Sequence, residues 1–389
     1  MPSRRAATRM TGGELRRIAI VGGGIASLTA AETLRREGFA GELTIIGDEP
    51  HPPYSRPALS KAALLDDEMT SHRLPDPEHG AQVVRGTAVT RLDLDRRTLH
   101  LAHGDPIEFD GLVIASGSRA RRLSDSPAEL TLRGLDDAVA LRGALASHPE
   151  VIVIGGGPLA MEVASGCRAT GSAVTLISRR APMTSQLGDV LAGALGAAAR
   201  DAGVRLVRSA HVAVDDCVGG ARVTLDDGRV LEAPLVVTAI GDDANVEWLA
   251  GSGLLHDGQL RVDSRDRVAP GIVAAGDVAT LHGPAGWARM PLWTSAIEQA
   301  KVAAAALLHG DAAPELSFQP YFWTDQFGIS LKVCGALPVA GDPEVIDGSI
   351  AEGRALLRWE HEGGSATAAA LGYRIPVPRL RAHTRTASY

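Results

Sequence analysis

Residues 16–48 read RRIAIVGGGIASLTAAETLRREGFAGELTIIGD, and residues 150–180 read EVIVIGGGPLAMEVASGCRATGSAVTLISRR. Each stretch consists of a short apolar run, a triple glycine, a helix-like segment, a further glycine and a second apolar run. This order is typical of a βαβ unit, and the continuous apolar runs indicate strands buried on both faces of a parallel sheet. The sequence therefore predicts an α/β protein with two Rossmann-like dinucleotide-binding domains.

The glycine spacing in each unit is that of a turn which binds a pyrophosphate. The turns are GGGIAS at 22–27 and GGGPLA at 155–160, each between a strand and a helix. The first glycine allows the turn, the second lets the backbone approach the phosphates, and a small residue in the third position lets helix pack on strand. The helix N-terminus adds free N–H groups and a partial positive charge. A single pattern of this kind is weak evidence, but two copies in the same context are specific.

The two units differ where their second strands end. The first ends in Asp48 and Glu49, and an acid at this place can accept hydrogen bonds from an adenosine ribose. The second ends in Ser178, Arg179 and Arg180, without an acid. The units are therefore expected to bind different dinucleotides. The two arginines favour NADPH over NADH, because guanidinium groups suit a 2′-phosphate. The alternative is that they are ordinary surface residues of an arginine-rich chain.

Composition excludes several other classes of protein. The 389 residues, 45% hydrophobic and 22% charged, predict two or three domains of a globular protein. A net charge of −7 argues against nucleic-acid binding, and no apolar run approaches the ~18–20 residues of a membrane span. The first 17 residues hold five arginines without an apolar core, so no secretory signal is expected. We expect a flexible tail at 1–15 and a cytoplasmic location.

Cysteine and histidine chemistry is not expected to contribute. The three cysteines are far apart, and no CxxC pair is present. This pattern excludes a zinc ribbon, an iron–sulfur cluster in this chain and a CxxC redox disulfide. No histidine occurs in a metal-binding spacing, so the sequence predicts no metal site.

Further motifs accompany the two glycine turns. They are YSRPALSK at 54–61, IASG at 114–117, AAGD at 274–277, WTSAIEQ at 293–299 and FWTDQFG at 322–328. Together the motifs resemble those of FAD-dependent pyridine-nucleotide ferredoxin reductases, the group that includes putidaredoxin reductase and is related to glutathione reductase. The resemblance fades after Gly335. With the positions of the βαβ units it implies an FAD domain at 16–120 and 245–313, an NAD(P)H domain at 121–244 and a small α+β C-terminal domain at 314–389.

The resemblance also implies roles for individual residues. FAD would be bound by Gly22, Gly24, Ala26, Asp48, Arg56, Lys61, Val89, Ala115, Gly117, Arg133, Gly276, Asp277 and Trp293. The nicotinamide coenzyme would be bound by Gly155, Gly157, Leu159, Ala160, Ser178, Arg179, Arg180 and Gly241. Lys61 would lie near the flavin N5 atom and pair with Glu162, and these two are the expected catalytic side chains.

The chain departs from the family pattern at three places. Ser27 replaces a glycine, Pro158-Leu159-Ala160 replaces a bulkier sequence ending in glycine, and Met290-Pro291-Leu292 replaces an acid and a polar residue before Trp293. The last two changes leave the identity of partner and substrate open.

Three hypotheses about function follow from these patterns. The first is an electron-transfer flavoenzyme that passes single electrons to a small [2Fe-2S] or similar ferredoxin, which then supplies an oxygenase. The ferredoxin would dock near the flavin edge and the C-terminal domain. The second is an NAD(P)H oxidase or small-molecule reductase with the same cofactors, FAD and NADPH (or NADH). The third is a flavin-bearing interaction protein similar to apoptosis-inducing factor.

Overall fold

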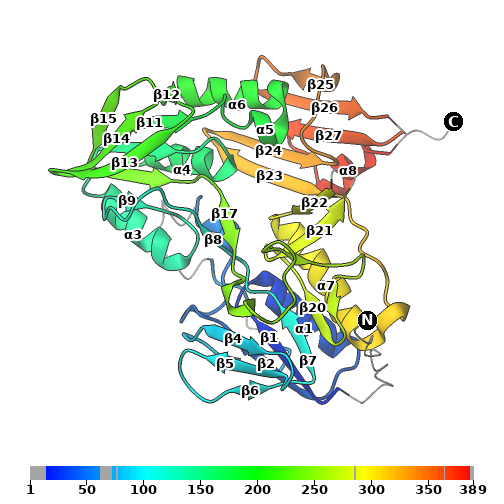
Figure 1. Cartoon of the computed structure of the whole chain (residues 1–389). Coiled ribbons are helices and arrows are strands. Elements are labelled where there is room, and N and C mark those ends of the chain that lie inside the picture. The colour runs from blue at the N-terminus through cyan, green and yellow to red at the C-terminus, as the bar shows by residue number, and fades with distance from the viewer. Residues whose placement is uncertain (1–14, 62–71, 76–77, 284–285, 363, 386–389) are drawn as a thin grey trace, which may run out of the picture.

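The computed structural model describes residues 15–61, 72–75, 78–283, 286–362 and 364–385 (Figure 1). The tail expected at 1–15 therefore lies almost wholly outside the described residues. Within them, no helix has the length and apolar character needed to span a bilayer.

The first βαβ unit forms the centre of a six-stranded sheet. It consists of β1 (Arg17–Val21), α1 (Ile25–Arg36) and β2 (Glu42–Ile46), with β1 and β2 parallel. The strand order is β19-β20-β7-β1-β2-β3, in which β3 is Gln82–Val84, β7 is Gly111–Ile114, β19 is Arg267–Ala269 and β20 is Ile272–Ala274. Segments on both sides of the second βαβ unit thus share one sheet.

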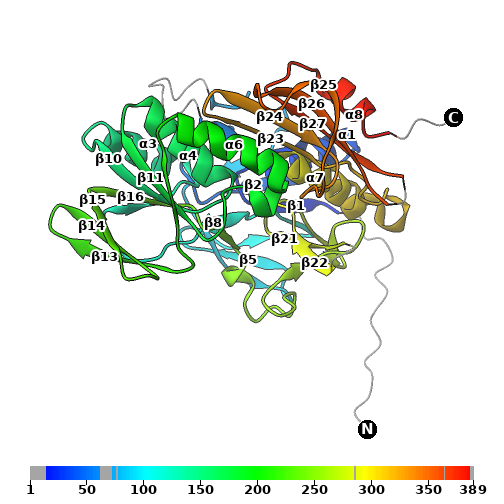
Figure 2. The same cartoon turned by 90° about the horizontal axis from the view of Figure 1, so that it is seen from above.

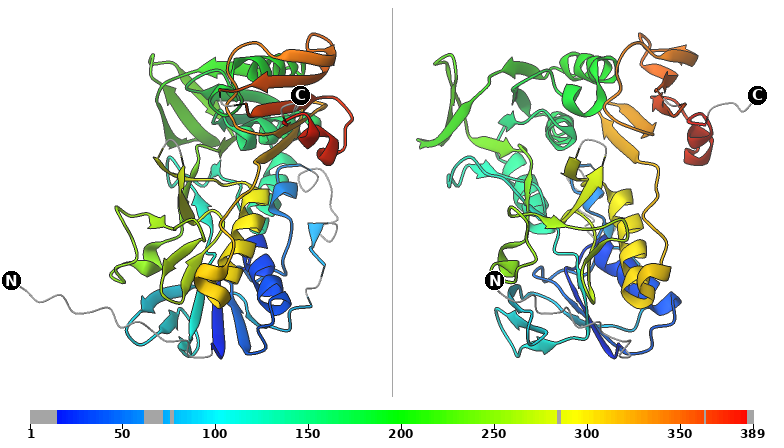
Figure 3. Two further views of the ribbon diagram at one scale, coloured as in Figure 1. Left: turned by 90° about the vertical axis from the view of Figure 1, so that its right-hand side faces the viewer. Right: turned by 45° about the vertical axis from the view of Figure 1, so that its right-hand side comes forward.

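The two faces of this sheet are covered by different layers. Ile18 and Ile20 of β1 point to the face where α1 packs beside α7 (Trp293–His309), through an alanine-rich contact (Figure 3). Ala19 and Val21 point to the opposite face. That face is covered by the small sheet β4 (Val89–Asp93), β5 (Thr98–Leu101) and β6 (Ile107–Glu108). This alternation explains why the strand is apolar throughout.

The second βαβ unit forms a five-stranded parallel sheet. It consists of β10 (Glu150–Ile154), α4 (Pro158–Ala169) and β11 (Ala173–Ser178), and the strand order is β12-β11-β10-β16-β9. The other strands are β9 (Glu129–Leu130), β12 (Arg205–Arg208) and β16 (Leu235–Thr238). Helices α3 (Leu135–Leu145), α5 (Thr184–Leu187) and α6 (Asp189–Asp201) complete one layer, and the antiparallel strands β13 (Val212–Cys217), β14 (Gly220–Leu225) and β15 (Val230–Ala233) form the other.

Shorter elements connect the two sheets. Strands β8 (Ser118–Ala120) and β17 (Asp242–Ala244) pair antiparallel where the chain crosses between them. Strands β18 (Leu260–Arg261), β21 (Ala279–Gly283) and β22 (Gly286–Arg289) form a separate three-stranded sheet. Elsewhere in the chain, 3-10 turns occur at Arg56–Ala58, Glu247–Leu249 and Gly310–Ala312.

The C-terminal region is an antiparallel sheet with one helix. Its order is β23 (Tyr321–Gln326), β24 (Ile329–Cys334), β27 (Ala366–Leu371), β26 (Arg354–Glu360) and β25 (Glu344–Ser349). One face shares a core with α4 and α6, and α8 (Val377–Ala382) packs on the other through Leu380 (Figures 1 and 2). The structure confirms the predicted fold class of two Rossmann-like domains and a small α+β region.

Candidate cofactor site

The first glycine turn is too tight for any other residue at its start. Gly22 has φ +126°, and a Cβ there would lie 2.1 Å from the Ala115 carbonyl oxygen. Gly23 lies beside Gly47, because a Cβ added to Gly23 would be in ordinary van der Waals contact with the Gly47 Cα, at 3.7 Å. The turn is therefore held against the ends of β7 and β2, and it delivers the chain into α1 at Ile25. The free N–H groups of that helix start suit a pyrophosphate.

A groove runs from this turn along the end of β2. Its lining includes Gly23, Gly47, Asp48, Glu49, Tyr54 and Arg56. Asp48 is exposed at this groove, where it can accept hydrogen bonds from a ribose. Val89 is not part of the lining; it starts β4 and packs in the core beneath the sheet. The exposed Asp48 carboxylate and the nearby glycine turn are groups that could hold the adenosine half of an FAD.

A cation is held at the turn by a hydrogen-bonded network. The Arg56 guanidinium forms an ion pair with Glu49 and donates to the Arg133 carbonyl oxygen at 2.9 Å. A Cβ added to Gly24 would lie 4.0 Å from Arg56 Nε, so the guanidinium lies over the phosphate turn. The Tyr54 hydroxyl donates to Glu49 at 2.5 Å, and burial raises the pKa of Tyr54. These contacts hold Arg56 beside the glycine turn, where its guanidinium could bind a phosphate.

The AAGD turn returns the chain to the same place from far along the sequence. Gly276 has φ +81°, and a Cβ there would lie 3.2 Å from the Ala26 Cβ in the first turn of α1. The Asp277 carboxylate accepts a hydrogen bond from Arg133 Nη2 at 2.6 Å. The structure thus brings Ala26, Arg133, Gly276 and Asp277 together. The turn is also held by the Gln299 side chain, which accepts a hydrogen bond from the Gly276 N–H at 3.1 Å.

The second turn repeats the geometry of the first. Gly155 has φ +144°, and a Cβ there would lie 2.2 Å from the Ala239 carbonyl oxygen. Gly157 precedes α4, and an added Cβ would lie 3.7 Å from Gln186 Nε2. Leu159 is half-buried, and Ala160 is fully buried against the core.

The end of β11 presents two unpaired cations. The Ser178 hydroxyl donates to the Arg180 carbonyl oxygen at 2.7 Å, which folds the chain sharply after the strand. Arg179 and Arg180 are both exposed, and neither guanidinium group has a hydrogen bond or ion pair to another described residue. Gly156 lies beside this turn, because a Cβ on it would be 3.0 Å from the Ser178 Cβ. The arginines are thus free to bind an anion next to the second glycine turn.

Gly117 and Gly241 mark the crossing between the two sheets. Gly117 (φ +68°) precedes β8 and lies beside Arg133, while Gly241 (φ +108°) precedes β17. Both carry a backbone conformation that favours glycine. They lie at the strand pair that joins the two sheets.

Lys61 and Glu162 form the expected ion pair. Lys61 Nζ lies 2.8 Å from Glu162 Oε2, with the two side chains 21% and 7% exposed. Lys61 belongs to the segment after the adenosine groove, whereas Glu162 is in α4 directly after the second glycine turn. The pair therefore joins the two dinucleotide sites, although its role toward a flavin stays a prediction. Trp293 begins α7 and is half-buried, and its contact with a flavin also stays a prediction.

Sequence reasoning missed several side chains around these residues. Arg289 donates to the Asp277 carbonyl oxygen at 3.1 Å and to the Asp242 carbonyl oxygen at 2.9 Å, so it ties β22 to β17. Ser60 and Thr324 both donate to Glu162. Thr324 lies within the FWTDQFG motif, but nothing in the motif shows which carboxylate it meets. Within the described residues, no group of three or more His, Cys, Asp or Glu side chains could hold a metal.

Comparison with known proteins identifies the family. The profile of the pyridine nucleotide-disulphide oxidoreductases matches residues 16–304. The chain belongs to this family. It is 34% identical over 351 residues to rhodocoxin reductase of Rhodococcus erythropolis, covering 86% of this chain and 82% of that protein. It is 35% identical over 335 residues to the ferredoxin–NAD(+) reductase component of the p-cumate 2,3-dioxygenase system of Pseudomonas putida, covering 83% and 82%.

Solved structures agree with this assignment. A ferredoxin reductase from Rhodopseudomonas palustris is 30% identical with a TM-score of 0.83, covering 92% of this chain and 91% of that one. The reductase in the covalent putidaredoxin reductase–putidaredoxin complex is 29% identical with a TM-score of 0.81, covering 92% and 89%. The resemblance inferred from the sequence motifs is confirmed.

Proposed function

We propose that this protein is an FAD-dependent reductase that oxidises a nicotinamide coenzyme and delivers electrons singly to a small iron–sulfur ferredoxin. The observation that carries the proposal is the Lys61–Glu162 pair, which joins the segment after the 3-10 turn at Arg56–Ala58 to the helix that follows the second glycine turn. FAD bound at the first turn would accept a hydride and release electrons one at a time, while protein groups bind, orient and tune it. The relatives named as ferredoxin–NAD(+) reductase components of dioxygenase systems support a ferredoxin as the partner.

The cysteines support electron transfer rather than disulfide chemistry. Cys167 and Cys334 are buried, and Cys217 lies on the β13–β14 hairpin, so no two of them form a disulfide. Burial raises the pKa of Cys167 to about 12, which leaves this thiol unreactive. A disulfide reductase needs a redox-active cysteine pair beside the flavin, and the three cysteines of this chain are free thiols.

The test is reduction of cytochrome c by the holoenzyme with and without an added [2Fe-2S] ferredoxin. We expect turnover that requires the ferredoxin. Fast peroxide formation without any partner would favour the alternative, an NAD(P)H oxidase or small-molecule reductase, which the altered residues at 158–160 and 290–292 keep in consideration. A yellow protein that no nicotinamide coenzyme reduces would instead favour an interaction protein.

We also propose that the coenzyme is NADPH in preference to NADH. The strand end that would carry an acid in an NAD-specific unit carries Ser178, Arg179 and Arg180. The Ser178 hydroxyl donates its proton to the Arg180 carbonyl oxygen. The guanidinium groups of Arg179 and Arg180 are therefore the groups available to bind a 2′-phosphate. Several relatives are named as NAD(+) enzymes, so this proposal separates the chain from them.

The ferredoxin is proposed to dock beside the flavin edge and the C-terminal sheet. Tyr321 and Trp323 of β23 stack at 5.6 Å between ring centroids, on the face away from α4. The Thr294 hydroxyl at the start of α7 donates to the Tyr321 carbonyl oxygen at 3.1 Å, which links this face to Trp293. An aromatic pair of this kind would offer apolar contact to a partner.

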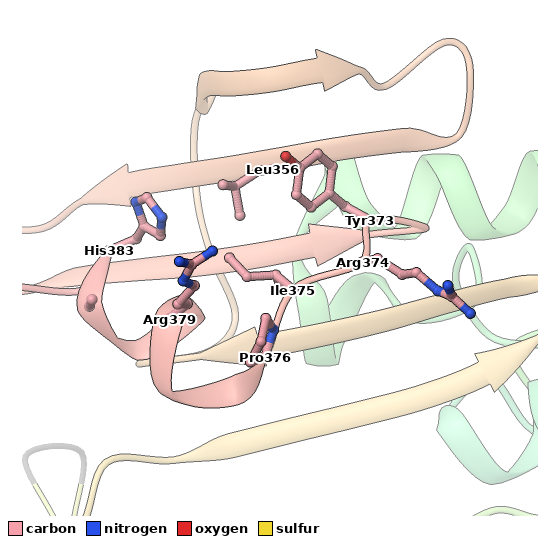
Figure 4. A pocket seen from close by; sticks show the side chains of 8 residues that line it. Leu356, Tyr373, Arg374, Ile375, Pro376, Arg379 and His383 are labelled. Atoms are coloured by element: carbon pink, nitrogen blue, oxygen red, sulfur yellow. The ribbon is translucent and has the colours of Figure 1, made fainter.

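Cations lie on the same side of the C-terminal sheet. A groove between β26 and α8 is lined by Leu356, Tyr373, Ile375, Pro376, Arg379 and His383, and Arg374 extends from its edge (Figure 4). Arg374 and Arg379 are exposed and make no ion pair with another described residue. Residues 363–389 include no Asp or Glu. This local positive potential would steer an acidic ferredoxin despite the net charge of −7.

A further inference from the structure

Thr324 contacts the Lys61–Glu162 pair from a third part of the chain. Its hydroxyl donates to Glu162 Oε1 at 2.6 Å, and the residue is fully buried. We infer that Thr324 is a positioning residue that fixes the Glu162 carboxylate and, through it, the Lys61 ammonium group. The inference rests on the proposed function, because it concerns the geometry of the same site.

The two oxygens of Glu162 have different partners. Oε2 accepts from both Ser60 Oγ and Lys61 Nζ, whereas Oε1 accepts from Thr324. The Glu162 side chain is only 7% exposed, so water cannot readily replace a missing donor. Without the Thr324 hydroxyl, a buried charged oxygen would lose its partner and the carboxylate would rotate to regain one. Rotation moves Oε2, and Lys61 Nζ would move with it.

Gln326 determines which way the Thr324 hydroxyl points. Gln326 Nε2 donates to Thr324 Oγ1 at 3.0 Å, and both side chains are buried. A hydroxyl group has a single proton, and that proton cannot face an N–H donor. The amide of Gln326 therefore directs the Thr324 proton toward Glu162. Alternate residues along β23 thus orient the site, while Tyr321 and Trp323 lie on the opposite face of the strand.

A second contact fixes the position of β23 relative to α4. The Phe327 backbone N–H, one residue beyond β23, donates to Ser165 Oγ of α4 at 2.7 Å. Ser165 lies three residues after Glu162, on the same side of the helix. The distance between Thr324 and Glu162 is therefore set by backbone as well as by side chains. The hydrogen bond between Thr324 and the Glu162 carboxylate therefore does not depend on Lys61.

The experiment compares Thr324→Val, which keeps the shape and removes the hydroxyl, with Thr324→Ser, which keeps the hydroxyl. Thr367→Val is the matched control, because Thr367 is fully buried in β27 and donates to the Ala336 carbonyl oxygen at 2.7 Å, away from Glu162. The chain has only three lysines, Lys61, Lys301 and Lys332. Acetylation of each lysine in the holoenzyme can therefore be followed by peptide mass spectrometry, with the other two as internal standards.

In the Thr324→Val variant, we expect Lys61 to be acetylated several-fold faster than in the wild type when its rate is expressed relative to Lys301 and Lys332. We also expect the bound flavin of this variant to be reduced by the coenzyme about tenfold more slowly at saturation, since a hydrogen bond to a charged group typically contributes this much. KM for the coenzyme should stay unchanged. Thr324→Ser and Thr367→Val should match the wild type in both measurements.

Two results would overturn the inference. One is a Thr324→Val enzyme whose Lys61 acetylation and flavin reduction equal those of Thr367→Val. The other is a Thr324→Ser enzyme as impaired as Thr324→Val, which would show that volume rather than the hydroxyl matters. Neither measurement uses a ferredoxin. Failure to pass electrons to a ferredoxin would therefore reject the proposed function without affecting the comparison of these variants.

Discussion

Asp266 is a buried carboxyl group in the turn before β19, and it should make the stability of the fold depend on pH. The residue is 0% exposed, and neither carboxylate oxygen has a hydrogen-bond partner among the described residues. Burial, together with the negative charge of Asp263, raises the pKa of Asp266 to about 8 from 3.8. The folded protein therefore holds a proton on Asp266 over a range in which the unfolded chain has lost it.

The sign and size of the effect follow from this difference in proton binding. As pH rises from about 4 to about 8, the free energy of unfolding falls by about 1.4 kcal/mol per unit, and above pH 8 the effect levels off. At pH 7 the accumulated loss is about 4 kcal/mol, as an upper value for this one group. Asp266→Asn removes the titration and keeps the shape. Its φ of +56° suits asparagine, which tolerates the left-handed conformation.

The assay is denaturant unfolding of wild type and Asp266→Asn from pH 5.5 to 7.5 at a fixed FAD concentration. From pH 5.5 to 7.5 the free energy of unfolding of the variant should rise by about 3 kcal/mol relative to that of the wild type. The contributions of other titrating groups cancel in this difference. Asp257→Asn is the control, since Asp257 is exposed and has φ +50°. An equal change with pH in this control would show that the effect is not specific to the buried position. Parallel curves for wild type and Asp266→Asn would refute the reasoning.

Four other perturbations test the cofactor and partner sites. Asp277→Ala should weaken FAD binding, measured by titrating apoprotein with FAD; unchanged affinity would remove Asp277 from the site. Lys61→Met should keep FAD but lower the midpoint potential of the flavin and slow its reduction. A cation ~4 Å from the reduced ring, at an effective dielectric of ~20, stabilises the negative charge by about 4 kcal/mol before desolvation. An unchanged potential would show that Lys61 does not act on the flavin. Arg179→Ala/Arg180→Ala should lower kcat/KM for NADPH far more than for NADH, and equal losses, or a wild type that prefers NADH, would contradict the phosphate-binding role. Arg379→Glu should lower ferredoxin-dependent turnover. It should also make turnover less sensitive to salt between ~50 and ~300 mM, whereas an unaltered salt dependence would place docking elsewhere.

Local patterns predicted the parts of the site that lie within one βαβ unit. Each glycine turn, strand and helix follows from a periodicity or a spacing of a few residues, and the structure confirms both units. These elements depend on side-chain period and on glycine conformations, which a short stretch of sequence specifies by itself.

Contacts between distant segments could not be predicted in this way. Thr324 meets Glu162 because the C-terminal sheet packs on α4, and Arg289 meets Asp242 because β22 lies beside β17. Both contacts depend on how whole sheets are placed relative to each other, which no local period encodes. The Lys61–Glu162 pair was predicted only through the family resemblance.

The third position of each glycine motif shows why the departures there do not change the cofactors. A Cβ built on Gly22 would lie 3.1 Å from Ser27 Oγ, and one built on Gly155 would lie 3.1 Å from the Ala160 Cβ. Small non-glycine side chains therefore occupy the same space in both turns. They fit because the first glycine, having no Cβ, leaves that space open.

The two turns are thus equivalent in shape, so turn shape cannot distinguish one dinucleotide from the other. The carbonyl oxygens that Gly22 and Gly155 approach would lie 2.1 Å and 2.2 Å from an added Cβ. What differs is the charge at the end of the second strand, where Asp48 is exposed in one unit and Arg179 in the other. An exposed carboxylate accepts hydrogen bonds from ribose hydroxyls and repels a phosphate, whereas a free guanidinium attracts one. We therefore expect selection between dinucleotides to depend on the strand ends, so that exchanging those residues should alter coenzyme choice without disturbing either turn.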